Sequence, residues 1–257
     1  TDWNTSATLS RINAQDGIYF ALGDRYADGS FRNNPDFTWG NSPFGQPIPG
    51  FGTLLIANNG IESKTNQVLL SLEKPYTAET GWAMTLAYTY TQAKENRLNA
   101  AINDEHYIFD YPDPSGQGFL PAIGIARHRV VLTGNWDGPW GVVYSGKATY
   151  ASPQAKDATN CFDAANFNDC RFDPLLPSGT FGQRQIDLAA SKNIDLGQGL
   201  GLGFRIDILN VFNYRNYTDY DTWRGGPGEP NANFGNINGP GILDPVRTVK
   251  LSIRATF

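Results

Sequence analysis

The feature that most constrains the fold is a strict alternation of large apolar with small polar side chains in "GWAMTLAYTYTQA". Trp82, Met84, Leu86, Tyr88 and Tyr90 would share one face of a β-strand. The residues between them, which are alanines and threonines, would share the other face. A water-soluble strand points its bulky groups at a core and its charged groups at solvent. This one instead fits a barrel in lipid, with an apolar outside and a hydrated lumen.

The same period of two recurs along the chain and predicts about eight strands. Aromatic residues make up 13% of the chain, glycine occupies 28 positions and methionine one, a balance that favours strands and turns over helices. A weak first strand near Trp3 is expected to continue through a bulge into "DGIYFAL". The clearer strands, paired in sequential antiparallel order, are expected near 66–76, 82–91, 125–136, 142–151, 185–195, 200–213 and 246–257.

The connections alternate in length. "TAETG", "DGPWG" and "LGQG" are short turns, whereas the stretches near 23–52, 94–124, 153–183 and 215–244 are each about thirty residues long. Loops of that length are uncommon in compact soluble domains, where the median is about 4 to 6 residues. Their strict interleaving with tight turns indicates a sheet that is trimmed at one end and elaborated at the other, as in outer-membrane barrels.

The aromatic residues fall into two groups about ten residues apart along the strands, the spacing of the girdles that flank a hydrocarbon layer. The alternative is that they cap the core of a β-sandwich. The group near the short turns is Tyr76, Trp82, Trp136 and Trp140, and the group near the long loops is Tyr88, Tyr90, Tyr150, Phe212 and Tyr214.

Several classes of function are disfavoured. A net charge of -5 without a Lys/Arg cluster argues against a nucleic-acid partner. The nearest catalytic grouping is His106 with Asp104 and Glu105, which fits a solvated loop better than an active site, so no enzyme, cofactor or metal site is predicted. The surrounding stretch 103–116 offers oxygen ligands of the kind that Ca²⁺ prefers, but their spacing does not match an EF-hand.

Cys161 and Cys170 are the two cysteines of the chain and lie in one polar loop. No second Cys or His pair completes a zinc site, so we predict a local disulfide formed in an oxidising compartment. Free surface thiols are the alternative.

Two further sets of residues are candidates for contact with a ligand or with water. Aromatic and amide side chains in the last long loop are the candidate ligand contacts, because binding residues concentrate on loops held by a rigid scaffold: Tyr217, Tyr220, Trp223 and Asn233. Charged residues on the polar strand faces are expected to line the lumen and to keep it hydrated: Arg127, Arg129, Lys147, Asp187, Arg205, Asp207, Lys250 and Arg254.

Two stretches resemble TonB-dependent outer-membrane receptors. "FRIDILNVFNYRNY", with Asn210 and Asn213, is similar to the penultimate strand of that family, and the chain then runs through a long loop to a last strand that closes on Phe257. "LLSLEKPYTAETGWAMTLAYTYTQAKEN" resembles its hairpins, with Lys-Pro before the short turn and Tyr-Thr-Tyr near the long loops. The resemblance implies that residues 1–257 are the last eight or so strands of a barrel of twenty-two.

The resemblance further implies an integral barrel in the outer membrane of a Gram-negative bacterium, where it takes up a bulky ligand such as a siderophore, glycan or peptide. The partners would be outer-membrane lipid, an extracellular ligand, the rest of the barrel with its plug domain, and TonB through an N-terminal part that this chain does not carry. Phe257 would be the membrane-assembly signal. A self-contained eight-stranded barrel that serves as an adhesin or anchor is the alternative. The two readings differ at the strand near Trp3, which in the fragment does not pair with the strand ending at Phe257.

Overall fold

The computed structural model describes residues 3–22, 55–96, 118–163, 171–179, 181–239, 241–243 and 246–257. Within these ranges the chain consists of β-strands and their connections, with one short 3-10 turn, η3 (Pro139–Gly141). No helical segment in the described ranges has the length and apolar character needed to cross a membrane.

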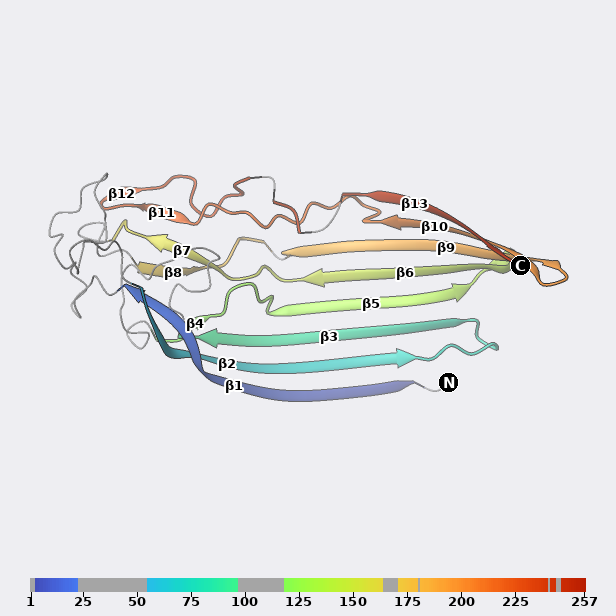
Figure 1. Ribbon diagram of the computed structural model, residues 1–257, viewed down its shortest axis with the longest axis horizontal. Helices are drawn as coiled ribbons and strands as arrows, with labels where there is room; N and C mark the ends of the chain where they lie inside the picture. The colour runs from blue at the N-terminus through green and yellow to red at the C-terminus, as the bar shows by residue number, and fades with distance from the viewer. Residues whose placement is uncertain are drawn as a thin grey trace.

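Eight strands form one antiparallel sheet in which each strand pairs with the next along the chain (Figure 1). The two-residue strand β4 (Leu120–Pro121) adds to the end of the third strand of this path. The all-β fold class and the sequential antiparallel order predicted from the sequence are confirmed. The strands in sheet order are β1 (Asn4–Leu22), β2 (Leu55–Lys74), β3 (Trp82–Glu95), β5 (His128–Asp137), β6 (Val142–Ala151), β9 (Gln183–Gly197), β10 (Leu200–Leu209) and β13 (Thr248–Thr256).

The first strand contains the predicted bulge. Its register against β2 shifts between Ala14 and Ile18, and Asp16 adopts a positive φ of 61°. Gly17 passes so close to β2 that an added Cβ would lie 2.9 Å from Ile61 Cβ. Glycine is therefore required where the bulged strand crosses its neighbour.

Three strand boundaries differ clearly from the expectation. β2 begins at Leu55, eleven residues before the expected start near 66, and pairs with β1 over this added length. β5 begins at His128 and not near residue 125, and β10 ends at Leu209 and not at 213. The early end of β10 has a clear cause: Asn210 and Asn213 both have positive φ, at 50° and 53°, and the Asn213 N–H donates to the Asn210 carbonyl at 2.7 Å. The Asn-x-x-Asn stretch is therefore a turn that ends the strand.

The three short turns lie at one end of the sheet, together with both chain termini (Figure 1). Each contains residues in the left-handed region, where glycine and a few polar residues are tolerated. Gly81 closes the β2–β3 turn by donating to the Thr77 carbonyl at 2.8 Å, Trp140 and Gly141 shape the β5–β6 turn, and Gln198 and Gly199 shape the β9–β10 turn. The predicted short joins are confirmed.

A second, smaller sheet at the opposite end was not predicted. Two connections that the sequence indicated only as long loops contribute β7 (Lys156–Asn160) with β8 (Arg171–Leu175), and β11 (Trp223–Gly226) with β12 (Glu229–Pro230). β7 and β8 pair antiparallel, and β11 joins β7 in parallel. The small sheet joins two connections that are distant in sequence, at the end of the main sheet away from the short turns.

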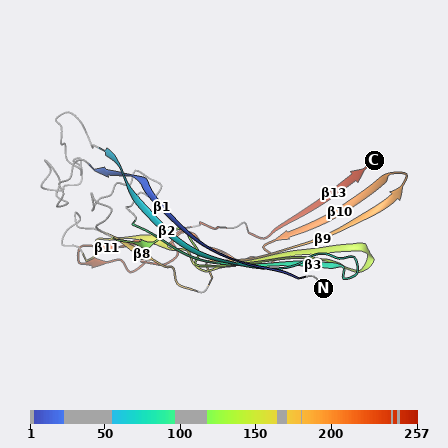
Figure 2. The same cartoon turned by 90° about the horizontal axis from the view of Figure 1, so that it is seen from below.

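The main sheet is open within the described residues. β1 and β13 stand at opposite ends of the pairing path and each has one neighbour. Figure 2 shows that the β9, β10 and β13 part turns away from the plane of the first strands, so that the sheet is curved. The buried side chains of the described ranges do not form a conventional apolar core: the largest fully buried ones belong to Asn160 and Cys161, at the end of β7, and to Asn210, after β10.

The predicted disulfide involves Cys161, which follows β7 and is 2% exposed, whereas Cys170 lies outside the described residues. The pairing therefore stays a prediction.

Closing a loop of about ten residues with a Cys161–Cys170 disulfide should stabilise this loop by roughly 2 to 3 kcal/mol. Mass spectrometry of the unreduced, digested protein should recover the two cysteines in one linked peptide pair. Quantitative alkylation of both thiols in the denatured, unreduced protein would contradict the pairing.

Candidate functional site

The pairing register gives the main sheet two unlike faces. Residues directly opposite each other in neighbouring strands share a face, so each row of partners can be followed across the sheet. One row on the apolar face consists of Met84, Gly134, Gly146, Leu188, Ile208 and Val249. One row on the other face consists of Asn135, Ser145, Ala189, Asp207 and Lys250.

Seven of the eight charged residues that the sequence assigned to a lumen occupy strand positions on this second face. Arg127 lies in a bend before β5, where its carbonyl accepts a hydrogen bond from the Thr91 N–H at 2.9 Å. The seven are Arg129, Lys147, Asp187, Arg205, Asp207, Lys250 and Arg254.

Five of these seven charges stand next to a partner of opposite sign. Lys147 is directly opposite Asp187, and Lys250 is directly opposite Asp207. The Arg205 guanidinium contacts Asp207 through two donors, with Nη2 2.6 Å and Nε 2.9 Å from Oδ1. Opposite charges across neighbouring strands stabilise the pairing and keep the surface strongly hydrated.

The other face carries large hydrophobic residues that remain exposed. Leu251 and Ile253 in β13 are each 74% exposed, and Phe257, in phase with them, is 98% exposed. Leu188 and Phe204 continue the apolar surface on β9 and β10. A contiguous apolar face of this extent marks a surface that contacts protein or lipid and not water.

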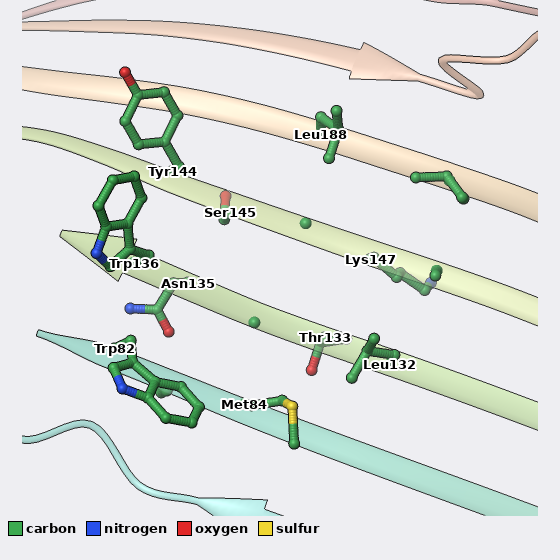
Figure 3. Close-up of a pocket in the computed structure, with 15 residues that line it drawn as sticks. Trp82, Met84, Leu132, Thr133, Asn135, Trp136, Tyr144, Ser145, Lys147 and Leu188 are labelled. Atoms are coloured by element: carbon green, nitrogen blue, oxygen red, sulfur yellow. The ribbon is translucent and has the colours of Figure 1, made fainter. Parts of the chain in front are cut away.

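A groove of about 680 Å³ runs along the apolar face between β3, β5, β6 and β9 (Figure 3). Gly134 and Gly146 are partners in its floor, and an added Cβ at Gly134 would lie 3.1 Å from the Ala83 carbonyl oxygen. Large side chains surround these two glycines, so the groove follows from the missing side chains. Its walls include Trp82, Met84, Leu132, Trp136, Tyr144 and Leu188.

Aromatic side chains gather at the short-turn end of the apolar face. Trp3 meets Trp82 edge to face with ring centroids 6.0 Å apart, and Trp136 stacks on Tyr144 at 5.6 Å. The Tyr76 hydroxyl donates to Asp137 at 2.5 Å, and this hydrogen bond raises the pKa of Tyr76. Residues from three hairpins are thereby tied together at one level.

A second group of aromatic residues lies at the long-loop end. Tyr88 donates to or accepts from His128 Nδ1 at 2.8 Å, and the Tyr90 ring centroid lies 5.2 Å from that of His128. Tyr150 packs on Phe181 at 5.7 Å. Trp82 and Tyr90 are eight residues apart on β3, a distance of about 26 Å along the strand at about 3.3 Å per residue. That separation suits a strand that crosses hydrocarbon at a tilt.

Lys74, of the Lys-Pro pair, fastens the β2–β3 turn. Only 4% of this residue is exposed. Its ammonium donates to the Thr80 hydroxyl at 2.7 Å and the Trp82 carbonyl at 2.9 Å, and it lies 4.3 Å from the centroid of a Trp82 ring. Lys74 therefore holds the turn together by donating to both of these acceptors. Its side chain reaches them from the apolar face of the sheet.

Buried asparagines perform the corresponding task at the long-loop end. The Asn210 amide donates to the Tyr214 carbonyl and accepts from the Tyr214 N–H, both at 2.8 Å, while the Asn210 N–H donates to Asp187 at 2.8 Å. Asn216 makes the same two-way contact with the backbone of Arg184. Each amide replaces a missing strand partner, which is why these polar side chains are buried without a penalty.

The predicted ligand contacts share one connection but do not converge. Tyr217 and Tyr220 are half-buried, form bridges to Ile242 and Ile237, and line one small cavity of about 30 Å³. Trp223 belongs to β11, and Asn233 is exposed in the turn beyond it. His106, Asp104 and Glu105 lie outside the described residues, and the described ranges contain no group of three or more potential metal ligands.

The sequence did not reveal a cavity of about 470 Å³ near the long-loop ends of β3 and β5. It lies where Lys94 and Arg127, separated by more than thirty residues in the chain, come together. Pairing of β3 with β5 creates this proximity, so only the register could have indicated it.

Comparison with known proteins identifies a structural relative. No protein-family model matches the chain, and no curated protein matches it. Among solved structures, the outer membrane transporter YddB from Escherichia coli is similar with a TM-score of 0.58 and 14% sequence identity. The match covers 100% of this chain and 31% of that transporter, so the chain spans about a third of its length. At this identity the similarity shows the fold alone.

The turn built on Asn210 generates a stability prediction. Asn210→Ala removes two hydrogen bonds. It also leaves alanine, which has a Cβ but no polar side chain, at a φ of 50°. We expect it to lower the free energy of unfolding by roughly 2 to 4 kcal/mol. Asn210→Gly should cost less, because glycine accepts the positive φ. Urea unfolding of the protein in lipid vesicles measures both, with the exposed Asn233→Ala as the control. Equal stability of Asn210→Ala and Asn233→Ala would contradict this role.

Proposed function

We propose that this chain forms the C-terminal part of the barrel of a TonB-dependent receptor in the bacterial outer membrane. The observation that carries the proposal is the register, which aligns the apolar residues of successive strands in continuous rows and the charged residues in the rows between. Such a sheet separates two unlike solvents, as a barrel wall separates lipid from a hydrated lumen. The similarity of the fold to part of YddB supports the same reading.

In this proposal the apolar face contacts lipid and the face with Arg205, Asp207 and Lys250 lines the lumen. The short turns face the periplasm, and the small sheet with its long connections faces outward. A bulky ligand, such as a siderophore, glycan or peptide, binds at the outward end and passes through the lumen. Binding there uses loops that a rigid sheet holds in place.

The sheet edges favour a larger barrel over a self-contained one. An eight-stranded barrel requires β1 to pair with β13, and these strands stand at opposite ends of the path. An open edge in hydrocarbon leaves each unpaired backbone group at a cost of several kcal/mol. We therefore expect further strands to pair with both edges, a plug domain to contact the polar face, and TonB to act through that plug.

The two faces generate the test of membrane orientation. Leu132→Arg places a cation on the proposed lipid face near the middle of β5, and we expect it to destabilise the barrel by about 2 to 4 kcal/mol. Thr133→Arg, one residue further, points to the polar face, where the added charge stays hydrated. It stands opposite Lys147, so we expect a loss of at most about 1 kcal/mol, clearly smaller than that at Leu132→Arg. The fraction of protein that migrates as the folded form in unheated gel samples measures assembly. A loss at Thr133→Arg equal to that at Leu132→Arg would refute the assignment of faces.

The terminal residue generates a second test. Phe257 follows β13 in phase with its apolar residues and is 98% exposed. If it is the signal for insertion, deletion of Phe257 should lower the yield of assembled barrel in the outer membrane without changing synthesis. The substitution Phe257→Tyr should leave assembly intact, because an aromatic residue is retained. Normal assembly after the deletion would show that the residue is not the signal.

A further inference from the structure

The cavity of about 470 Å³ at the long-loop end is lined by basic residues, whereas the chain as a whole is acidic. Lys94 and Arg127 line it. No Asp or Glu is among its lining residues, although acidic residues outnumber basic ones in the chain, 25 to 20. Within the described residues neither Lys94 nor Arg127 forms an ion pair. The cavity is therefore a cationic site on an acidic protein.

The same cavity has an apolar wall. Ile125, Leu175 and Leu176 line it, and Ile125 and Leu176 remain 41% and 64% exposed. These residues are contributed by the segment before β5 and by the end of β8, so the small sheet completes the cavity. Apolar side chains that stay exposed beside unpaired cations fit a ligand with an apolar body and an anionic group.

The walls are held by backbone hydrogen bonds. The Arg127 carbonyl accepts from Thr91 at 2.9 Å, and the Ser152 N–H donates to the His128 carbonyl at 2.9 Å. The Ser152 hydroxyl also accepts from the His128 N–H at 3.0 Å. Each contact links strands or segments that are distant in sequence. The site is thus largely formed before a ligand arrives, which lowers the entropy cost of binding.

We propose that this cavity binds a soluble amphipathic anion, with phosphate, sulfonate or carboxylate on an aromatic or aliphatic body. Lys94 and Arg127 contact the anion, and the Ile125, Leu175 and Leu176 wall covers the apolar body. The volume is that of a typical small-molecule site. The binding chemistry stands on the cavity itself, whereas its role as the entry point for ligand rests on the proposed function.

Calorimetric titration of the purified protein in phosphatidylcholine nanodiscs tests the binding site with 2-naphthyl phosphate as the probe. We expect saturable binding, with 2-naphthol and inorganic phosphate each binding at least tenfold more weakly. Arg127→Gln combined with Lys94→Gln should weaken binding of the probe at least tenfold. Arg127→Lys should retain most of the affinity, because it keeps the charge. Leu176→Asn should weaken binding of 2-naphthyl phosphate and leave that of inorganic phosphate unchanged.

The matched control is Arg254→Gln, which removes a cation from the polar face near the short turns, away from this cavity. Its affinity should stay within twofold of the parent. Absence of saturable binding, equal binding of 2-naphthol, or an equal loss at Arg254→Gln would overturn the proposal. Discs that contain phosphatidylglycerol should give the same affinity. Abolition of binding in those discs would overturn the soluble ligand in favour of an anionic lipid.

A second measurement separates this site from the proposed function. Ala122→Cys, which lines the cavity and leaves both cations in place, should react in intact cells with a membrane-impermeant thiol reagent, and 2-naphthyl phosphate should slow the reaction. Labelling that the probe slows supports an outward-facing entry site. Failure of labelling in cells, with binding to the purified protein retained, would overturn the entry role and leave the anion site standing.

Discussion

The structure depends on the backbone hydrogen-bond ladder that joins its eight main strands in a fixed register. A strand in hydrocarbon has no water to satisfy its N–H and C=O groups, so it must take these bonds from its neighbours. Because side chains alternate with a period of two, the register also decides which side chains share a face, and a slip of one residue would exchange the faces of a strand. Met84, Gly134 and Gly146 in one row, and Thr133, Lys147 and Asp187 in a row on the opposite face, show that the register keeps apolar and polar positions apart.

The ends of the ladder need other means of satisfying the backbone, and the chain uses polar side chains for this purpose. Lys74 saturates carbonyl and hydroxyl acceptors at the β2–β3 turn. Asn210 and Asn216 take the place of strand partners where β10 ends and where the last long connection begins. These side chains are buried while leucines and isoleucines on the sheet face stay exposed, the inverse of a soluble domain. The long connections build a second sheet, and its strand β8 contributes to a cationic cavity at the long-loop end of the main strands.

The sequence predicted the parts of the fold that local pattern controls. The alternation through Trp82 to Tyr90 located β3, and the short turns and the β1 bulge followed from glycine and polar residues. It did not predict β7 or β11, because "KDATN" and "WRGG" are too short to show a period and pair with each other in parallel across more than sixty residues. It placed candidate ligand contacts in the loop with Tyr217 and Tyr220 by residue type alone. The cavity between Lys94 and Arg127 exists only once β3 and β5 are paired, so no local signal could reveal it.

The most direct test of the account is a scan of single spin labels along β3 from Trp82 to Thr91, with the protein in lipid bilayers. Electron paramagnetic resonance measures how accessible each label is to oxygen, which concentrates in hydrocarbon, and to a water-soluble nickel complex. The account predicts that oxygen accessibility peaks at the even-numbered positions and nickel accessibility at the odd-numbered ones, with opposite phase along the strand. Peaks of both reagents at the same positions, or nickel access at Met84, Leu86 and Tyr88, would contradict a sheet that separates lipid from a hydrated lumen.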